Sequence, residues 1–421
     1  MECRKLRRPV SSGVSYPAHR MLSKPQVRVL RQIPRSVWIL GSVSLFMDVS
    51  SEIIHSLLPM FLMASLAASA ATIGLIEGIA EATALVVKVF SGTLSDYLGN
   101  RKWLAVAGYG LGALSKPLFA VAPTIGVVVS ARIMDRIGKG IRGAPRDALV
   151  ADVTPSHLRG AAFGLRQALD TAGAFLGPLL AVVIMLLWAD NFRLAFWLAA
   201  IPAVIAVGLL TFGIEEPARE PGSKRVNPVR WASIKQLGGR YWRVVIVGAV
   251  FALARFSEAF LVLRAMGSGV PIALVPLVMV AMNVVYSLSA YPFGKLADTA
   301  NHTRLLVAGL IVLIAADLVL AHGTHWGVVL VGVGLWGLHM GMTQGLLATM
   351  VSHTAPAQLR GTAFGLFNLV SGCVTLVASV VAGELWDYIG AAATFYAGAG
   401  FCVVTVALLL FCRAPVTSVP G

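Results

Sequence analysis

The sequence predicts an all-α membrane protein with twelve transmembrane helices in two pseudo-symmetric six-helix bundles. Three observations support this fold class: the composition, a series of long apolar runs, and a repeat at half the chain length. Of the 421 residues, 57% are hydrophobic and 13% are charged, and the mean hydropathy is +0.80. Because a soluble domain carries roughly 25% charged residues, this composition indicates a chain that resides in a lipid bilayer.

Apolar runs of about 20 residues recur from Ser36 onward, and each is long enough to cross a ~30 Å hydrocarbon core as a helix. The twelve spans that fit best are residues 36–62, 71–94, 103–121, 124–145, 160–188, 193–213, 243–264, 270–294, 304–321, 326–349, 360–385 and 391–412. The chain then divides into an N-terminal tail, a first bundle, a linker, a second bundle and a C-terminal tail, at residues 1–35, 36–213, 214–242, 243–412 and 413–421.

The chain repeats itself at half length. Gly-Thr-Leu-Ser-Asp at 92–96 recurs as Gly-Lys-Leu-Ala-Asp at 294–298, and Leu-Arg-Gly-Ala-Ala-Phe-Gly-Leu at 158–165 recurs with one change at 359–366. The offsets are 202 and 201 residues, as expected for a duplicated six-helix unit. Two such bundles, related by an axis along the membrane normal, enclose a central cavity that opens alternately to each side.

The net charge of +15 reflects membrane topology. With twelve spans both termini lie on one side, and 25 of the 34 Lys and Arg residues fall on that side. The opposite loops contain two, Arg193 and Arg264. Cytoplasmic loops carry this excess of basic residues, so both termini are predicted to be cytoplasmic. The basic residues therefore do not indicate nucleic-acid binding.

Several function classes lack the residues they need. The four cysteines, Cys3, Cys373, Cys402 and Cys412, show neither a disulfide framework nor metal-ligand spacing. No phosphate-binding loop or nucleophile elbow is present, which argues against an ATP-driven pump and against an enzyme. The basic N-terminal tail has no apolar core and so is not a signal peptide, and Met21 is a second candidate for the start. We expect no cofactor and no bound metal.

A loop motif between the second and third spans then indicates a family. The pattern Gly92-x-Leu-Ser-Asp96-x-x-Gly99-x-Arg101-Lys102 resembles the signature loop of the major facilitator superfamily, and the resemblance extends over the chain from about residue 36. It implies a secondary transporter. The second copy of the motif lacks a glycine equivalent to Gly99. We assign a cytoplasmic gate, in which Asp96 pairs with a basic residue or caps a helix, to Gly92, Asp96, Gly99, Arg101, Arg146 and Asp298. The alternative is a loop that merely obeys the positive-inside rule.

Two further stretches resemble family motifs in part. Arg136-x-x-Lys139-Gly140 resembles a fourth-span motif whose arginine is linked to proton coupling, although Lys139 replaces the usual glutamine. Gly173-x-x-x-Gly177-Pro178 resembles a fifth-span element of antiporters, without the glycine pair that usually follows. The stretches 48–52 and 135–147 are similar to a prokaryotic branch with no settled substrate, which implies the inner (plasma) membrane.

Charged residues inside spans cost roughly 2.5–3.5 kcal/mol or more, so each needs a partner, water or a function. On a helical wheel, Arg132, Arg136, Lys139 and Arg146 of the fourth span lie within about 80° of one another. We expect Arg146 to join an ion-pair network with Asp147. For the three deeper residues, cavity lining and structural pairing are equally compatible with the sequence.

The first and seventh spans carry the other candidate site residues. Asp48, Glu52 and His55 share one face of the first span, and Arg255 and Glu258 lie in the seventh. The resemblance implies that spans one, four, seven and ten line the cavity. Carboxylates there could load protons near neutral pH, or could simply neutralise the nearby arginines. We take Asp48, Glu52, Arg136 and Glu258 as proton-coupling candidates, and as substrate-cavity candidates His55, Arg132, Lys139, Arg255, His339 and Gln344.

Other charged residues of the spans are expected to be structural. Arg166 and Asp170 are four residues apart and should pair within one helix. Glu77, Glu81 and Lys88 share a face of the second span and should pair across helices, whereas Lys116 and Asp317 stand nearly alone.

The favoured function is secondary active transport of a small solute, by proton-coupled efflux or antiport. A uniporter or importer of an organic anion is the first alternative, and a receptor or scaffold with a transporter fold is the second. The excess of basic over acidic residues in the fourth span favours an anionic substrate. The expected partners are this small molecule, protons and lipid, and we expect a monomer.

Overall fold

The computed structural model describes residues 32–98, 100–216, 234, 236–356 and 359–411. Most of both tails, most of the linker, Cys3, Cys412, Met21 and Gly99 therefore lie outside the described residues. The first half contains α2 (Arg35–Leu66), α3 (Ala70–Leu98), α4 (Arg101–Val121), α5 (Ile125–Asp152), the 3₁₀ turn η1 (Ser156–Leu158), α6 (Arg159–Leu187) and α7 (Phe192–Gly213). These are six long helices, one for each predicted span of this half.

The second half repeats this plan with two interrupted helices. It contains α8 (Gly239–Ala254), α9 (Ala259–Met266), the 3₁₀ turn η3 (Ile272–Leu274), α10 (Leu277–Thr299), α11 (His302–His322), α12 (Trp326–Thr343), α13 (Leu346–Thr354), α14 (Arg360–Tyr388) and α15 (Ala391–Phe411). The seventh span is thus α8 followed by α9, and the tenth is α12 followed by α13. The all-α fold with twelve spans is confirmed.

The prediction of continuous helices at 243–264 and 326–349 was wrong. The first is interrupted at Arg255–Glu258 and the second at Gln344 and Gly345. Gly345 has a φ of 75°, a left-handed conformation that favours glycine. Both segments are long and apolar on average, and the charged residues at Arg255 and Glu258 do not by themselves predict that the helix is interrupted there.

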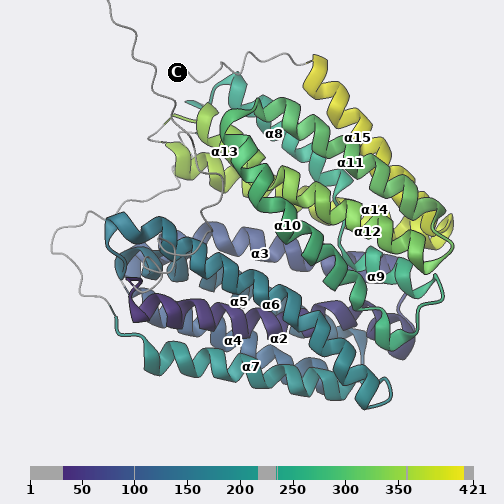
Figure 1. Cartoon of the computed structure of the whole chain (residues 1–421), viewed down its shortest axis with the longest axis horizontal. Coiled ribbons are helices and arrows are strands. Elements are labelled where there is room, and N and C mark those ends of the chain that lie inside the picture. Colours follow the sequence, from purple (N-terminus) through teal and green to yellow (C-terminus); the bar gives the residue numbers. More distant parts are fainter. Residues whose placement is uncertain (1–31, 99, 217–233, 235, 357–358, 412–421) are drawn as a thin grey trace, which may run out of the picture.

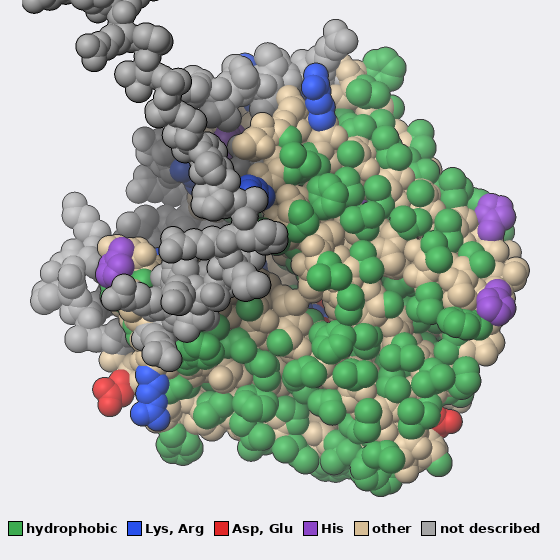
Figure 2. Space-filling view, viewed as in Figure 1, with side chains coloured by type: hydrophobic (Ala, Val, Ile, Leu, Met, Phe, Trp, Pro, Cys, Tyr) green, Lys and Arg blue, Asp and Glu red, His purple; other side chains and the backbone are tan. Residues whose placement is uncertain are grey.

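Ten of the described helical segments are long and apolar enough to cross a membrane by composition alone. The two remaining spans, α3 and α5, carry the charged residues that pair with each other inside the first half. Apolar side chains cover most of the face shown in Figure 2, and charged groups lie mainly at its edges. Phe212, at 90% exposed, and Leu288, at 73%, illustrate a surface suited to lipid.

The two halves meet along two seams. Figure 1 shows the first half, purple to teal, below the second, green to yellow, with α3 beside α14 and α10 crossing near α6. Glycines permit the close approach of α3 and α14. A Cβ atom on Gly74 would overlap the carbonyl oxygen of Ser379, and one on Gly383 would lie 2.6 Å from that of Ala70. This contact of small residues is typical of membrane helices.

The end of the molecule opposite Arg35 and Phe411 is closed by contacts between the halves. The carboxylate of Asp387, near the end of α14, accepts hydrogen bonds from the backbone N–H groups of Ala70 (3.0 Å) and Ala71 (2.8 Å). It therefore caps the N-terminus of α3 from the other half. At the same end α9 packs against α2. Any opening of this end must break these contacts.

Candidate functional site

A cavity of about 410 Å³ lies between the two halves. Its walls come from α2, α3 and α5 on one side and from α8, α12, α13, α14 and the α8–α9 break on the other. The first half contributes a mostly charged wall, made of Glu52, His55, Glu81, Leu85, Arg136 and Lys139. The second half contributes a mostly apolar wall with a few polar groups.

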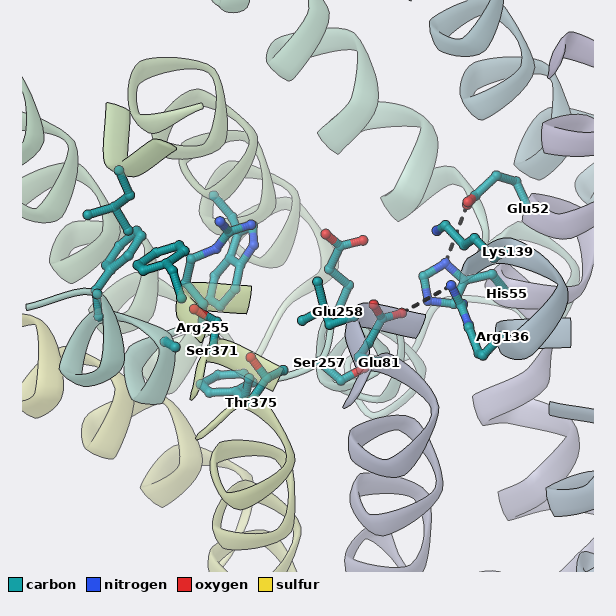
Figure 3. A pocket seen from close by; sticks show the side chains of 18 residues that line it. Glu52, His55, Glu81, Arg136, Lys139, Arg255, Ser257, Glu258, Ser371 and Thr375 are labelled. Atoms are coloured by element: carbon teal, nitrogen blue, oxygen red, sulfur yellow. Dashed lines mark hydrogen bonds and ion pairs between the residues drawn. The ribbon is translucent and has the colours of Figure 1, made fainter. Parts of the chain in front are cut away.

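The charged wall consists of ion pairs between helices and within them (Figure 3). Arg136 of α5 lies 3.1 Å from Glu81 of α3, measured from Nη1 to Oε1. On α2, Nδ1 of His55 lies 3.4 Å from Oε2 of Glu52. Lys139, one turn beyond Arg136, is exposed to the cavity and forms no ion pair within the part of the chain that the structure describes. This wall therefore presents two ion pairs, Glu81–Arg136 and Glu52–His55, and one cation, Lys139, that has no ion-pair partner among the described residues.

A second layer of charge lies behind this wall. Nη2 of Arg132 donates to Glu77 at 2.6 Å, and both side chains are buried. His55 connects the two layers, because its Nε2 lies 4.0 Å from Glu77 while its Nδ1 faces Glu52. Two carboxylates therefore compete for this one imidazole.

The same layer continues toward α4. Nζ of Lys116 donates to Asp135 at 2.7 Å, and Asp135 also lies 4.0 Å from Nε of Arg136. Lys116 was expected to stand nearly alone, so this buried pair is a correction. The charges form a connected network from the cavity into the core of the first half.

Glycine contacts bring the charged helices together. A Cβ atom on Gly138 of α5 would lie 2.6 Å from the carbonyl oxygen of Gly108 on α4, and one on Gly140 would lie 2.7 Å from Cβ of Val87 on α3. The close approach of α5 to α3 places Arg136 within reach of Glu81. The positions 132, 136 and 139 follow the helical repeat, so all three side chains leave α5 on one face.

The Gly-x-x-x-Gly-Pro element of α6 sets the position of α2. A Cβ atom on Gly173 would lie 2.7 Å from the carbonyl oxygen of Leu45, and one on Gly177 would lie 2.5 Å from Cβ of Glu52. These two glycines therefore let α6 lie directly against the helix that carries Glu52 and His55. A larger residue at Gly177 would displace the coupling candidate itself.

The opposite wall is built on aromatic rings, contributed by Phe251, Phe256, Trp336 and Phe367. The guanidinium of Arg255 lies 5.8 Å from the ring centre of Phe251. Figure 3 shows Glu258 between the two walls and Arg255 on the side of the second half. Among the described residues, neither Arg255 nor Glu258 forms an ion pair within 4 Å. The helix break therefore presents one cation and one anion to the cavity without a fixed partner.

Six of the predicted coupling and cavity residues line the cavity, namely Glu52, His55, Lys139, Arg136, Arg255 and Glu258. The other four do not. Asp48 is half-buried one turn before Glu52, and Gln344 is exposed at the α12–α13 break. Arg132 and His339 are buried behind the walls. Nδ1 of His339 lies 2.8 Å from the carbonyl oxygen of Gly309, so its ring binds α11.

Sequence reasoning missed Glu81 and the aromatic wall as parts of the cavity. A signal for Glu81 existed, because it follows Glu77 by four residues and both face the basic stripe of α5. The aromatic rings carried no such signal, since apolar rings are common throughout membrane spans. Ser371 and Thr375 of α14, which also line the cavity, were missed for the same reason.

The predicted gate is described only in part. The side chains of Asp96 and Asp298 lie outside the described residues, as does Gly99. A Cβ atom on Gly92 would lie 3.6 Å from Cβ of Ala144 on α5. Arg101 forms an ion pair with Asp152 at the end of α5. These contacts join α3, α4 and α5 within the first half.

Glu216 lies at the N-terminus of α4. Its carboxylate accepts from the backbone N–H groups of Arg101 and Lys102, each at 2.8 Å, and so caps that helix. Sequence reasoning did not foresee this contact between the end of the first half and α4.

Arg146 belongs to a separate ion-pair network, near the end of the first half at which α2 begins and α5 ends. It lies 3.1 Å from Asp147 and 3.7 Å from Asp170, and it donates to Ser44 at 2.9 Å. The expected pair of Arg166 with Asp170 is confirmed at 2.5 Å. This network joins α2, α5 and α6 and does not reach the cavity walls.

Two six-helix bundles around a central cavity define a class of membrane protein, the twelve-helix transporters. The model of the Major Facilitator Superfamily matches residues 40–371 and 267–421, and the chain belongs to this superfamily. It is a multi-pass membrane transporter and not an enzyme.

Relatives and solved structures agree with this assignment. The chain is 32% identical, over 90% of its length and 96% of the relative's, to an uncharacterized MFS-type transporter of Methanocaldococcus jannaschii. It is 23% identical to the quinolone resistance protein NorA of Staphylococcus aureus, over 84% of this chain and 90% of NorA. Its fold resembles the crystal structure of the nucleoside transporter NupG, with a TM-score of 0.76, 12% identity, and coverage of 90% of this chain and 100% of that one.

Proposed function

We propose that the protein is a proton-linked exporter that exchanges protons for a small solute by alternating access. One observation carries the proposal: a cavity between the halves in which two carboxylates, Glu52 and Glu81, each lie beside a basic partner. A carboxylate that can exchange its basic partner for a proton links proton binding to substrate binding. We place both termini in the cytoplasm and the protein in the plasma membrane, which makes the closed end the outer end.

In this mechanism Glu52 is the coupling carboxylate. The charged groups that face it are His55 on α2, Arg136 and Lys139 on α5, and Glu258 at the α8–α9 break. Glu81 on α3 lines the same cavity, and Glu77 is connected through His55. A proton taken up by Glu52 removes its attraction for His55. The imidazole is then left to Glu77, which lies 4.0 Å from its other nitrogen. The proton therefore rearranges a pair that spans the cavity wall and the buried layer.

The two unlike walls support an amphipathic substrate with an aromatic ring. Lys139 offers a charge without a fixed partner, and the rings of Phe251, Phe256 and Trp336 offer an apolar surface opposite. Ligand sites commonly combine aromatic walls with a few placed polar groups. An acidic quinolone, which carries a carboxylate on a flat ring system, has this chemistry. The similarity to the quinolone resistance protein NorA also favours a quinolone as the test substrate.

The test uses purified protein in proteoliposomes with an imposed pH gradient and a radiolabelled acidic quinolone. The proposal predicts accumulation against the quinolone gradient by the wild type. Glu52→Gln should lose pH-driven accumulation and retain quinolone–quinolone exchange, because exchange needs no net proton movement. Glu384→Gln is the matched control, since this residue is exposed on α14 outside the cavity. Full pH-driven accumulation by Glu52→Gln would contradict the role of Glu52.

A second candidate function is a uniporter or importer of an organic anion. The cations Lys139 and Arg255 favour it, because they approach the cavity from opposite walls and neither has an ion-pair partner among the described residues. This alternative is supported if quinolone only reaches equal concentrations on the two sides of the membrane, at a rate that does not depend on the pH gradient. Binding without flux would instead support a receptor, and a thermal shift with the same quinolone detects binding directly.

A further inference from the structure

The second half contains a buried carboxylate that the mechanism above does not use. Asp317 of α11 is 0% exposed, and neither carboxylate oxygen has a hydrogen-bond or ion-pair partner within the described residues. Buried carboxylates in proteins are normally paired or hydrogen-bonded, because the charged form is strongly disfavoured without a donor. In this environment the group is stable as a neutral acid.

One aromatic ring separates Asp317 from the cavity. A Cβ atom on Gly398 of α15 would lie 2.7 Å from Oδ2 of Asp317 and 3.0 Å from Cε1 of Phe256, so the three groups meet at one point. Phe256 also lines the cavity. It belongs to the α8–α9 break, where the backbone lacks a continuous helical ladder. Phe256 thus lies between Asp317 and the cavity, packed against the rings of Phe260, Trp336 and Phe395.

Two other buried polar atoms lie in or behind the same aromatic wall. Nε1 of Trp336 and Nε2 of His339 also have no partner among the described residues. The Trp336 ring lies 5.4 Å from that of Phe256, and the His339 ring 5.6 Å from that of Phe251. Together with Asp317, three residues in or behind this wall have buried polar atoms without a partner among the described residues, where such atoms are normally hydrogen-bonded.

The titratable and charged neighbours do not neutralise Asp317. Cys402 on α15 is the one whose charge interacts with Asp317, whereas His339 on α12 and Arg255 and Glu258 at the α8–α9 break, the titratable groups of the adjoining aromatic wall, do not. None of them lies within hydrogen-bond or ion-pair distance of the carboxylate in the described structure. The charge network of the first half involves other residues, so Asp317 titrates apart from it.

We propose that Asp317 is a second proton-binding site, located in the second half, and that the ring of Phe256 controls its access from the cavity. In the closed position of the ring the carboxyl group keeps its proton. When the ring moves, the O–H bond breaks, the proton passes to cavity water and the carboxylate remains. The transport consequence rests on the proposed proton-linked function, whereas the protonation itself does not.

The first test is infrared spectroscopy of the purified full-length protein in detergent, in which the spectrum of each variant is compared with that of the wild type. The wild type and the control Glu384→Gln should both show a carboxylic-acid C=O band that is absent in Asp317→Asn. An unchanged band in Asp317→Asn would overturn the proposal. The asparagine side chain is nearly isosteric, and the unfolding temperature of each variant verifies the fold.

Phe256→Ala tests the site without altering the carboxyl group. Removal of the ring should accelerate hydrogen–deuterium exchange of the Asp317 acid band at least tenfold, whereas Phe367→Ala, a ring elsewhere on the same wall, should not. Equal exchange rates in wild type and Phe256→Ala would show that this ring is not the barrier. Where Asp317→Asn does not fold, the shift of the acid band in Asp317→Glu assigns the band, so the exchange measurement stays decisive.

The transport test counts protons moved per acidic quinolone, using a pH-sensitive dye inside proteoliposomes. Asp317→Asn should lower this ratio about twofold, because it removes one of two titrating carboxylates and leaves Glu52, on which the coupling of both protons to quinolone depends. An unchanged ratio would contradict the second site while leaving proton-linked transport intact. If the wild type moves quinolone without protons, the proposed function fails, and the infrared band still decides the protonation of Asp317.

Discussion

The two halves share an architecture and differ in how they treat charge. In the first half, α5 is a continuous helix whose basic residues pair with acids on α3, as Arg132 does with Glu77 and Arg136 with Glu81. In the second half the tenth span, α12 and α13, occupies the equivalent place, is interrupted at Gly345 and presents Trp336 to the cavity. The two copies of the duplicated unit have thus diverged: the first forms the charged wall of the cavity and the second forms the aromatic wall.

This difference indicates a division of labour. A continuous helix holds its side chains in fixed register, which a network of ion pairs requires because each buried charge needs its partner in place. An interrupted helix can change the position of a few residues without moving the whole span. We therefore assign proton coupling mainly to the first half, and substrate-dependent movement to the α8–α9 and α12–α13 breaks of the second.

The largest expected effect concerns the buried pair that supports the charged wall. Arg132→Met should lower the free energy of unfolding by about 3–5 kcal/mol, because it leaves Glu77 buried without its partner. The double variant Arg132→Met/Glu77→Leu should recover most of this loss, since an apolar pair leaves no uncompensated charge. Denaturant titration in detergent micelles measures both. A double variant as unstable as the single one would show that the network is not held by charge pairing.

A smaller effect is expected at the cavity surface. Glu81→Gln should tighten binding of the acidic quinolone about tenfold, or roughly 1.4 kcal/mol, because it releases Arg136 from its ion pair and removes a repelling carboxylate. Quenching of tryptophan fluorescence reports the affinity. Glu384→Gln, at a carboxylate outside the cavity, should leave the Kd unchanged. Weaker binding by Glu81→Gln would indicate that the substrate interacts with this carboxylate as a cation.

The smallest effect tests the closed end that joins the halves. Asp387→Ala removes the cap on α3 at a cost of about 1 kcal/mol, which favours opening of that end by about fivefold. The reporter is Thr375→Cys in the cavity, in a background without native cysteines. A membrane-impermeant maleimide added from the closed end should label it faster in Asp387→Ala. Glu384→Ala, one turn earlier on α14, should label at the wild-type rate, and equal rates in both variants would contradict the role of the cap.

The sequence predicted the helices and the charged wall well, for physical reasons. A span must be long and apolar, and a charge inside it must face away from lipid, so both features leave local patterns. The spacing of Arg136 and Lys139 on α5, and of Glu52 and His55 on α2, therefore placed each pair on one face turned away from lipid, while the family resemblance implied that these helices line the cavity.

The second half could not be predicted in the same way. The break at Arg255–Glu258 contains neither glycine nor proline, and its helix is interrupted by tertiary packing that no local pattern records. The isolation of Asp317 likewise depends on how α11 and α15 meet. The sequence also did not show which acid pairs with Arg136. Glu52 and Glu81 both line the cavity, and only the packing of α3 on α5 selects Glu81.

The central claim is that substrate movement and proton movement are linked through the charged wall, and proton flux driven by substrate alone tests it most directly. Acidic quinolone is added outside proteoliposomes that contain a pH-sensitive dye, with equal pH on both sides. The account predicts that quinolone entry makes the lumen alkaline in the wild type and in Glu384→Gln, but not in Glu52→Gln or in protein-free vesicles. Quinolone entry through the wild-type protein without any change in lumenal pH would contradict it.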